Sequence, residues 1–374
     1  MVLNQTRPLV FTSNEPGMGR VPKPVSRQLV ELRYAIAREY ALVDKADSTL
    51  DGFTDLEISE PETNLNVEPE TSTEPETEPK TEPETEPESE KPSARGKRKI
   101  REEIAYFLKR VREIRAFCLE RERLGEAVDS LGMRPAEACW RLIPRGIPAD
   151  FLLYAMTMHW PKDTRADAGV FTDTPEEFSN GRLREFSAQI MAERGIPTGE
   201  FHALFGYILI LAEAKQPIQL IGPHGTGKSF LAEQIARYLD LNYGETPMTP
   251  GATRGDLLGR HTIGGFVPSE YCEIYSGGGV FNFEEIDASD PSMLIVLNNS
   301  LANERLFNSS NGERYEKHAD FTPVSTANTF SLGATKDYTG REKIDAASND
   351  RWRMGRVFVP LDEAIEEKIA YGLL

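Results

Sequence analysis

The chain has 374 residues, a formal net charge of −17 and an apolar fraction of 39%. Its length allows two domains, and its acidity argues against a general attraction to nucleic acid. The N-terminus lacks the apolar core of a signal peptide, and no run approaches the roughly 18 apolar residues of a membrane span, so we expect a cytoplasmic protein with no membrane partner.

The N-terminal part of the chain divides into two segments of different composition. Residues 1–47 contain one predicted short helix, because four apolar side chains recur at helical spacing. They are Leu29, Leu32, Ile36 and Tyr40. Residues 48–94 are rich in Pro, Glu and Thr, with ten Glu against two Lys from Val67 to Pro92. Such a segment buries too little to offset the entropy of ordering, so we expect a disordered acidic tether; an acidic docking tail is the alternative.

Residues 95–194 are predicted to be a helical region. Its first part carries one apolar stripe at helical spacing, with mixed charges on the other faces. The stripe consists of Ile100, Ile104, Phe107, Val111, Ile114 and Cys118. The basic cluster from Arg95 to Arg101 is interpreted as a solvated face, with contact to nucleic acid as the alternative. Residues 131–195 are predicted to form a small helical module, whose chemistry the sequence does not reveal.

A glycine-rich motif lies between a predicted strand and a predicted helix. PIQLI (217–221) is an apolar run suited to a buried parallel strand, and GPHGTGKS (222–229) leads into an amphipathic helix. Glycines let the backbone N–H groups face phosphate oxygens, and the helix N-terminus adds partial positive charge. We expect Lys228 to reach the β- and γ-phosphates, Ser229 to bind Mg²⁺, and His224 to be a spacer. The predicted nucleotide-binding residues are Gly222, Pro223, His224, Gly225, Thr226, Gly227, Lys228, Ser229 and Phe230.

A second strand is predicted to carry the carboxylates that hydrolysis requires. In GGGVFNFEEIDASDP (277–291) an apolar run is followed by three acids, Glu284, Glu285 and Asp287. A carboxylate at the strand end can hold the hydration shell of Mg²⁺, and its neighbour can polarise the attacking water. We therefore predict a metal site at Ser229 and Glu284, with Glu285 as the catalytic carboxylate. A helix is expected after Asp290, a residue type that favours the N-cap position.

Two further polar elements follow in the sequence. FTPVSTANT (321–329) is a short predicted strand that ends at Asn328, whose amide can orient the lytic water. SNDRWRMGRVFVPL contains three arginines before a final apolar strand. An arginine that reaches a neighbour's γ-phosphate would stabilise the transition state and make hydrolysis depend on assembly. The three arginines are Arg351, Arg353 and Arg356.

In this order and spacing, GPHGTGKS, GGGVFNFEEIDASDP, STANTFSLGATKDYTGREKID and ASNDRW resemble the AAA+ ATPases of the MoxR and dynein-related group. Within that group the sequence looks most like the ATPase subunit of cobalt chelatase and its relatives in bacteria and their phages, over about residues 195–365. The resemblance implies an α/β fold, namely a P-loop NTPase αβα sandwich with a five-stranded parallel sheet. It also implies that residues 195–374 are an ATPase domain that binds ATP and Mg²⁺ and assembles into a homo-hexameric ring.

The same resemblance assigns individual residues. Residues 222–229 match Walker A, and Glu285 matches the Walker B glutamate. Asn328 matches the sensor 1 residue, and Arg351 matches the arginine finger. The segment GRHTIGGFVPSEY (259–271) lies where this group carries a hairpin insert that faces the ring pore. That placement makes it the candidate substrate-engaging loop.

Three features depart from the family pattern. Glu284 occupies a position that is usually Asp, and its extra methylene shifts the carboxylate. The helical lid and its sensor 2 arginine are expected to be absent or truncated after Asp362. The tether and the helices before residue 195 have no counterpart in the family.

The leading hypothesis is therefore an ATP-hydrolysing ring subunit that remodels a protein or protein–cofactor partner. One alternative is a motor that acts on DNA, because of the basic cluster near residues 95–101. The other is a nucleotide-binding scaffold with little turnover, because of Glu284 and the lid. In cobalt chelatase the ATPase subunit holds neither tetrapyrrole nor metal, so the resemblance does not identify the partner.

Overall fold

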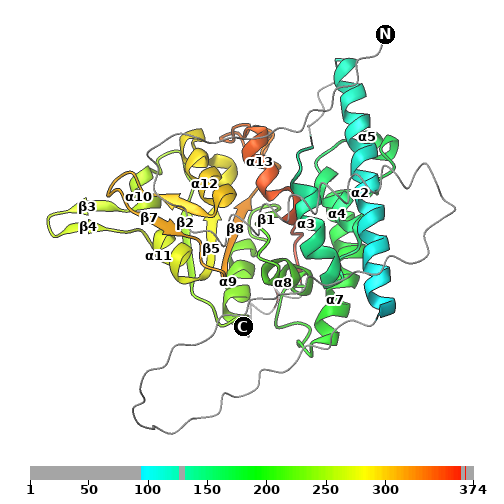
Figure 1. Cartoon of the computed structure of the whole chain (residues 1–374), viewed down its shortest axis with the longest axis horizontal. Helices are drawn as coiled ribbons and strands as arrows, with labels where there is room; N and C mark the ends of the chain where they lie inside the picture. Colours follow the sequence, from blue (N-terminus) through cyan, green and yellow to red (C-terminus); the bar gives the residue numbers. More distant parts are fainter. Residues whose placement is uncertain (1–93, 126–130, 364–366, 368–374) are drawn as a thin grey trace, which may run out of the picture. The chain divides into compact units, whose positions relative to one another are not determined.

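The fold is organised around a five-stranded parallel sheet, which the computed structural model forms from strands between residues 218 and 358 (Figure 1). The strand order is β2-β5-β8-β1-β9. The bounds are Ile218–Ile221 (β1), Tyr243–Pro247 (β2), Gly279–Glu284 (β5), Phe321–Ala327 (β8) and Arg356–Phe358 (β9). The three central strands are buried along almost their whole length, as parallel strands covered on both faces must be. The predicted α/β fold is confirmed.

The register of the sheet brings the ends of its central strands together. Ile221, the last residue of β1, pairs with Ala327, the last residue of β8. In β5, Phe283 pairs with Ser325 of β8, so the end of β5 lies at the same edge. Ligands of open α/β sheets bind at the carboxyl ends of their strands. The polar residues that follow these strands therefore face one region.

Helices cover both faces of the sheet. On one side lie α8 (Phe205–Glu213) and α9 (Lys228–Tyr238), and the Thr322 hydroxyl of β8 donates to the Ala212 carbonyl of α8. On the other side lie α11 (Glu270–Gly277), α12 (Pro291–Asn303) and α13 (Ala346–Trp352). The period-2 alternation of a strand points Phe281 and Phe283 of β5 toward this second side. Their rings lie 5.1 and 5.3 Å from the ring of Tyr271 on α11, which makes the core of this layer aromatic.

The start of α12 agrees with the prediction from sequence. Asp290 is the N-cap, its carboxylate accepts from the Ser292 N–H, and proline occupies the first helical position. A short 3₁₀ turn, η3 (Ile286–Ala288), separates β5 from this helix. This turn places Asp287 inside the protein.

Helices precede the sheet, as predicted. The apolar stripe of α2 (Ala94–Arg123) is buried except at its first member, Ile100, which is partly exposed. The stripe packs on α3 and α4. The bounds of the other elements are Arg134–Leu142 (α3), Ile143–Arg145 (η1), Ala149–Thr157 (α4), Lys162–Asp167 (α5), Pro175–Phe178 (α6), Ser179–Leu183 (η2) and Arg184–Glu193 (α7). The division between this region and the ATPase domain after residue 194 stays a prediction.

The helical region contacts the sheet domain directly. The Arg134 guanidinium of α3 pairs with the Asp350 carboxylate of α13 at 2.8 Å. The Ser179 hydroxyl donates to the Phe358 carbonyl at the end of β9, at 2.7 Å. The described residues from Ala94 onward belong to one compact unit of the chain.

Two small antiparallel hairpins complete the fold. One joins β3 (Arg260–Thr262) and β4 (Gly265–Val267), after the short helix α10 (Arg254–Leu258). It projects away from the sheet in Figure 1. It confirms a hairpin within residues 259–271, where the sequence resemblance expected one. The other hairpin joins β6 (Arg305–Phe307) and β7 (Arg314–Glu316) and was not predicted. A 3₁₀ turn, η4 (Arg353–Gly355), precedes β9.

The structure describes residues 94–125, 131–363 and 367. The predicted short helix in residues 1–47 lies outside these ranges, as does the predicted tether, except for Ala94, at which α2 begins. The expectation for the lid also falls mostly outside them. Among the helices that are described, none has the length and apolar character needed to cross a membrane.

Candidate functional site

The glycine-rich loop connects β1 to α9 as the sequence predicts. Gly225 and Gly227 both have a φ of +76°, a conformation that favours glycine, and Gly227 is the N-cap of α9. A Cβ would meet no more distant part of the chain at either residue, so it is the backbone conformation that favours glycine there. At Gly222 a Cβ would instead meet the Val359 carbonyl oxygen at 2.3 Å. The first residue of the loop is therefore packed closely against the residue that follows β9.

Lys228 links this loop to the end of β8. Its ammonium donates to the carbonyls of Gly222 at 2.9 Å and Pro223 at 2.6 Å, and to the Asn328 side-chain oxygen at 3.2 Å. The side chain is only 9% exposed. Burial lowers the pKa of the ammonium from 10.5 to about 8, because the charged form loses hydration that nearby carboxylates restore only in part. The lysine and the predicted sensor residue thus lie together.

The predicted metal ligands also meet. The Ser229 hydroxyl at the start of α9 donates to Glu284 Oε1 at the end of β5, at 2.5 Å. Hydroxyl and carboxylate oxygens are the hard donors that Mg²⁺ prefers, usually alongside substrate phosphates and water. Glu284 therefore reaches the serine despite the position being one where Asp is usual. The residues present fit a Mg²⁺ ion.

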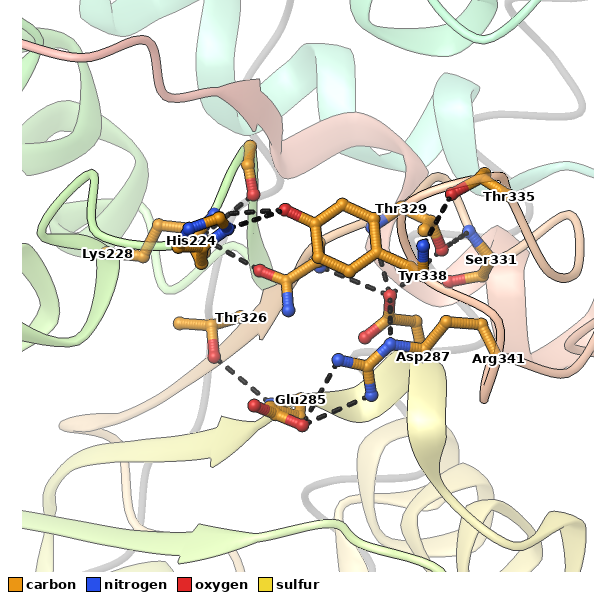
Figure 2. A network of polar contacts seen from close by, with 12 residues as sticks. His224, Lys228, Glu285, Asp287, Thr326, Thr329, Ser331, Thr335, Tyr338 and Arg341 are labelled. Carbon is orange, nitrogen blue, oxygen red and sulfur yellow. Dashed lines mark hydrogen bonds and ion pairs between the residues drawn. The ribbon is translucent and has the colours of Figure 1, made fainter.

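Glu285 lies in a turn rather than in the strand. Its φ is 51°, uncommon for a residue with a side chain, and its N–H donates to the Thr326 hydroxyl of β8 at 3.2 Å. Its carboxylate is half exposed and forms an ion pair with Arg341, whose two terminal nitrogens lie 3.1 and 3.2 Å from Oε2 (Figure 2). The turn thus aims Glu285 into the region between the glycine-rich loop and the segment after β8.

Asp287 is buried next to this pair. Its Oδ2 atom accepts from the backbone N–H groups of Asn328 and Thr329, at 3.2 and 2.9 Å, and from the Thr329 hydroxyl at 2.9 Å. The same oxygen lies 3.4 Å from Nε of Arg341. Asp287 therefore fixes the backbone that carries Asn328. From sequence Asp287 was only one of three acids in an acidic run.

A segment of the loop after β8 contacts the glycine-rich loop. The Tyr338 hydroxyl lies 3.2 Å from both the backbone nitrogen and Nδ1 of His224 in the glycine-rich loop (Figure 2). His224, predicted as a spacer, thus contacts this second loop. Neither Tyr338 nor Arg341 was predicted, because nothing in the local sequence pattern around them indicates where they lie.

The three arginines near the end of the chain have different environments. Arg353 and Arg356 are fully buried; the Arg353 Nε lies 3.4 Å from Asp350, and Arg356 donates to Gln219 of β1 at 3.1 Å. Arg351 is partly exposed on α13 and donates to the Asn298 carbonyl of α12 at 3.1 Å and to the Ala347 carbonyl. Both of these carbonyls belong to helices rather than to the glycine-rich loop. Of the three, Arg351 alone has a guanidinium that another chain could reach.

The order of these parallel strands, with a lysine-bearing glycine loop after β1 and carboxylates at the end of β5, defines a P-loop NTPase domain. Comparison with protein families narrows that class. Residues 217–352 match the family described as AAA domain (dynein-related subfamily). The match includes the glycine-rich loop, Glu284, Glu285, Asn328 and Arg351.

Three solved structures are similar to parts of this chain at low identity. A protein from Cytophaga hutchinsonii is 16% identical over 51% of this chain and 56% of its own, with a TM-score of 0.38. NtrX from Brucella abortus is 15% identical over 60% of this chain and 57% of its own, with a TM-score of 0.38. NtrX in complex with ADP is 14% identical over 63% and 50%, with a TM-score of 0.36. The chain thus spans 57% or less of the length of these structures.

Proposed function

We propose that this chain is a Mg²⁺-dependent ATPase that works as one subunit of a homo-oligomeric ring and remodels a protein partner. The observation that carries the ATPase proposal is the meeting of three strand ends. Lys228 contacts Asn328, and Ser229 contacts Glu284 at 2.5 Å. These are the groups that phosphoryl transfer to water requires close together.

Each residue has a defined task in this proposal. The backbone N–H groups of residues 225–229 bind the β- and γ-phosphates, and the Lys228 ammonium leaves the loop carbonyls for phosphate oxygens. Mg²⁺, when bound at Ser229 and Glu284, supplies charge neutralisation to the phosphates. Glu285 accepts a hydrogen bond from the attacking water, and the Asn328 amide orients that water. Water attacks the γ-phosphorus and gives a proton to the Glu285 carboxylate, the bond to the β–γ bridging oxygen breaks, and ADP and phosphate leave.

The proposal of a ring that remodels a partner is based on two exposed side chains. Arg351 lies partly exposed on α13, where a neighbouring subunit's nucleotide could be contacted. At the tip of the β3–β4 hairpin, the side chain of Ile263 is fully exposed, so a partner protein could bury it. A remodelling role like that of the MoxR and cobalt chelatase group, through this hairpin, agrees with both features.

The ATPase proposal is tested by turnover and binding measured on the same variants. Glu285→Gln is expected to lower kcat by roughly a hundredfold or more, since it removes the general base but keeps the size of the side chain. ATP affinity is expected to stay within about threefold of wild type. Glu342→Gln, an exposed carboxylate in the loop after β8, is the matched control. Equal turnover in wild type and Glu285→Gln would exclude Glu285 as the base, and binding without turnover in wild type would favour a scaffold.

A DNA-acting motor is the second candidate, and one observation favours it. Lys97, Arg98, Lys99 and Arg101 are exposed near the start of α2, although Arg98 pairs with Glu102 at 2.8 Å. If DNA is the partner, DNA stimulates ATP turnover and the stimulation falls steeply with salt, because phosphate contacts release counterions. Absence of stimulation at low salt counts against this candidate and leaves the protein-remodelling proposal in place.

A further inference from the structure

The loop between β8 and α13, residues 328–345, is a closed structure rather than a simple connection. At its base the Ile344 N–H donates to the Ser331 carbonyl at 3.0 Å, and Leu332 and Lys343 form an antiparallel bridge. Ile344 is buried in the core beneath. Farther along, the loop contains a turn in which the Thr335 N–H donates to the Tyr338 carbonyl at 3.0 Å. This closed base fixes where the rest of the loop lies.

Arg341, on the returning half of the loop, is anchored by a buried carboxylate. The arginine side chain is 11% exposed and the Asp287 side chain is 0% exposed, with Nε and Oδ2 3.4 Å apart. Asp287 is itself held by the backbone of Asn328 and Thr329 at the end of β8. A buried carboxylate held by several donors is a fixed point of charge. The guanidinium therefore has little freedom to move.

The free face of the same guanidinium holds Glu285. Both terminal nitrogens contact the single oxygen Oε2, at 3.1 and 3.2 Å, while Glu285 remains half exposed (Figure 2). An ionised carboxylate has about four acceptor positions, two on each oxygen. Arg341 therefore occupies one oxygen of Glu285 and leaves Oε1 for a water molecule.

We infer that Arg341 is a positioning residue for ATP hydrolysis: anchored on Asp287, it fixes the Glu285 carboxylate so that one oxygen faces the attacking water. The inference rests on the proposed ATPase function and adds a residue to it. Glu285 needs such support because it sits in a strained turn with a half-exposed side chain, and an exposed glutamate otherwise samples several rotamers. The arginine comes from the same subunit as the glutamate, so this positioning does not require assembly.

A purely structural role for Arg341 makes a different prediction. If the arginine only fixes the loop, its loss lowers turnover whether or not residue 285 is a glutamate. If it acts through Glu285, its loss has little effect once Glu285 is already replaced. The double-mutant cycle between positions 341 and 285 separates the two, since residues that act as a unit are not additive.

The experiment measures kcat, KM and ATP affinity for Arg341→Gln, Arg341→Lys and Lys336→Gln, each in the wild-type and Glu285→Gln backgrounds. Lys336 is an exposed cation of the same loop, so its variant controls for the loss of one positive charge. Slow turnover in the Glu285→Gln background is followed by single-turnover release of labelled phosphate. Nucleotide affinity is measured with a fluorescent ATP analogue, and a retained affinity shows that the variant is folded around its site.

Arg341→Gln is expected to lower kcat by roughly ten- to a hundredfold with little change in ATP affinity, the effect of a misplaced catalytic group. Arg341→Lys should be intermediate, since an ammonium is a point charge without the planar fork. In the Glu285→Gln background Arg341→Gln should change turnover by less than about twofold. The inference is overturned by an equal loss in both backgrounds, by wild-type turnover in Arg341→Gln, or by an increase. Should wild type bind ATP without turning it over, the ATPase proposal fails first and this inference with it.

Discussion

ATP binding is expected to be coupled to protonation of Lys228. In the nucleotide-free protein burial lowers the pKa of this ammonium from 10.5 to about 8. A triphosphate placed against the ammonium favours its charged form and moves the pKa back toward its ordinary value. At pH values above about 8, where the free site has lost its proton, binding must therefore take a proton up.

The size of the effect follows from the two pKa values. If ATP restores the ordinary lysine pKa of 10.5 from the value of about 8, linkage gives uptake of about 0.5 proton per ATP at pH 8 and about 0.9 at pH 9. The same linkage weakens ATP binding about tenfold, or about 1.4 kcal/mol, between pH 7 and pH 9. The direction is fixed: affinity falls as pH rises, because the deprotonated amine accumulates in the free protein. A phosphate group loses its own last proton near pH 6, below this window.

Isothermal titration calorimetry measures the proton uptake directly. Titrations at pH 7, 8 and 9 in two buffers of different ionisation enthalpy give the number of protons bound per ATP. The Glu285→Gln background keeps the nucleotide intact during the titration. Lys228→Arg is the control, because a guanidinium stays charged throughout this range and should show neither uptake nor a pH-dependent affinity. Uptake below about 0.2 proton at pH 9, or equal affinity at pH 7 and pH 9, would refute the argument that burial has lowered the pKa of Lys228.

Two further predictions concern the loop and the metal site. Gly222→Ala places a Cβ 2.3 Å from the Val359 carbonyl oxygen, so urea unfolding should show a loss of about 1–3 kcal/mol or more; Gly181→Ala, with open space at its Cβ, should change stability by less than about 0.5 kcal/mol. Glu284→Gln removes the charge facing Ser229, so the Mg²⁺ concentration for half-maximal turnover should rise by roughly ten- to a hundredfold. An unchanged Mg²⁺ requirement would mean that Glu284 takes no part in holding the ion.

Sequence reasoning predicted the parts of the site that neighbouring residues encode. The glycine-rich motif between a strand and a helix predicts Lys228 and Ser229 at the first turn of that helix, and the helix begins at Lys228. Glu284 and Asn328 were predicted because each directly ends an apolar run. Parallel strands end at a common edge, so residues at such ends converge without any knowledge of tertiary contacts. The same reasoning gives the central sheet.

For the three arginines near the end of the chain, the local sequence pattern does not predict which side chains are buried. Three arginines stand close together before the predicted last strand, and this local pattern does not distinguish one from another. They are Arg351, Arg353 and Arg356. In the structure Arg353 and Arg356 are fully buried and Arg351 is not. The partners that permit burial of the Arg356 guanidinium include Gln219 of β1 and Asn349 of α13, which belong to other elements of the fold than Arg356 itself, the first residue of β9. Only tertiary packing separates a structural arginine from an exposed one.

Asp287 shows why the rest of the site could not be predicted from the sequence. The sequence places it in one acidic run with Glu284 and Glu285, and period-2 alternation would give such neighbours alternating directions. The left-handed conformation of Glu285 breaks that alternation and sends Asp287 inward. Once buried, the carboxylate must find donors, and those nearest are the backbone N–H groups at the end of β8 and the guanidinium of Arg341. A single backbone turn thus leaves the Glu285 carboxylate half exposed and buries Asp287 against the end of β8. In that turn the Glu285 N–H donates to the Thr326 hydroxyl of β8, another contact that the local sequence does not reveal.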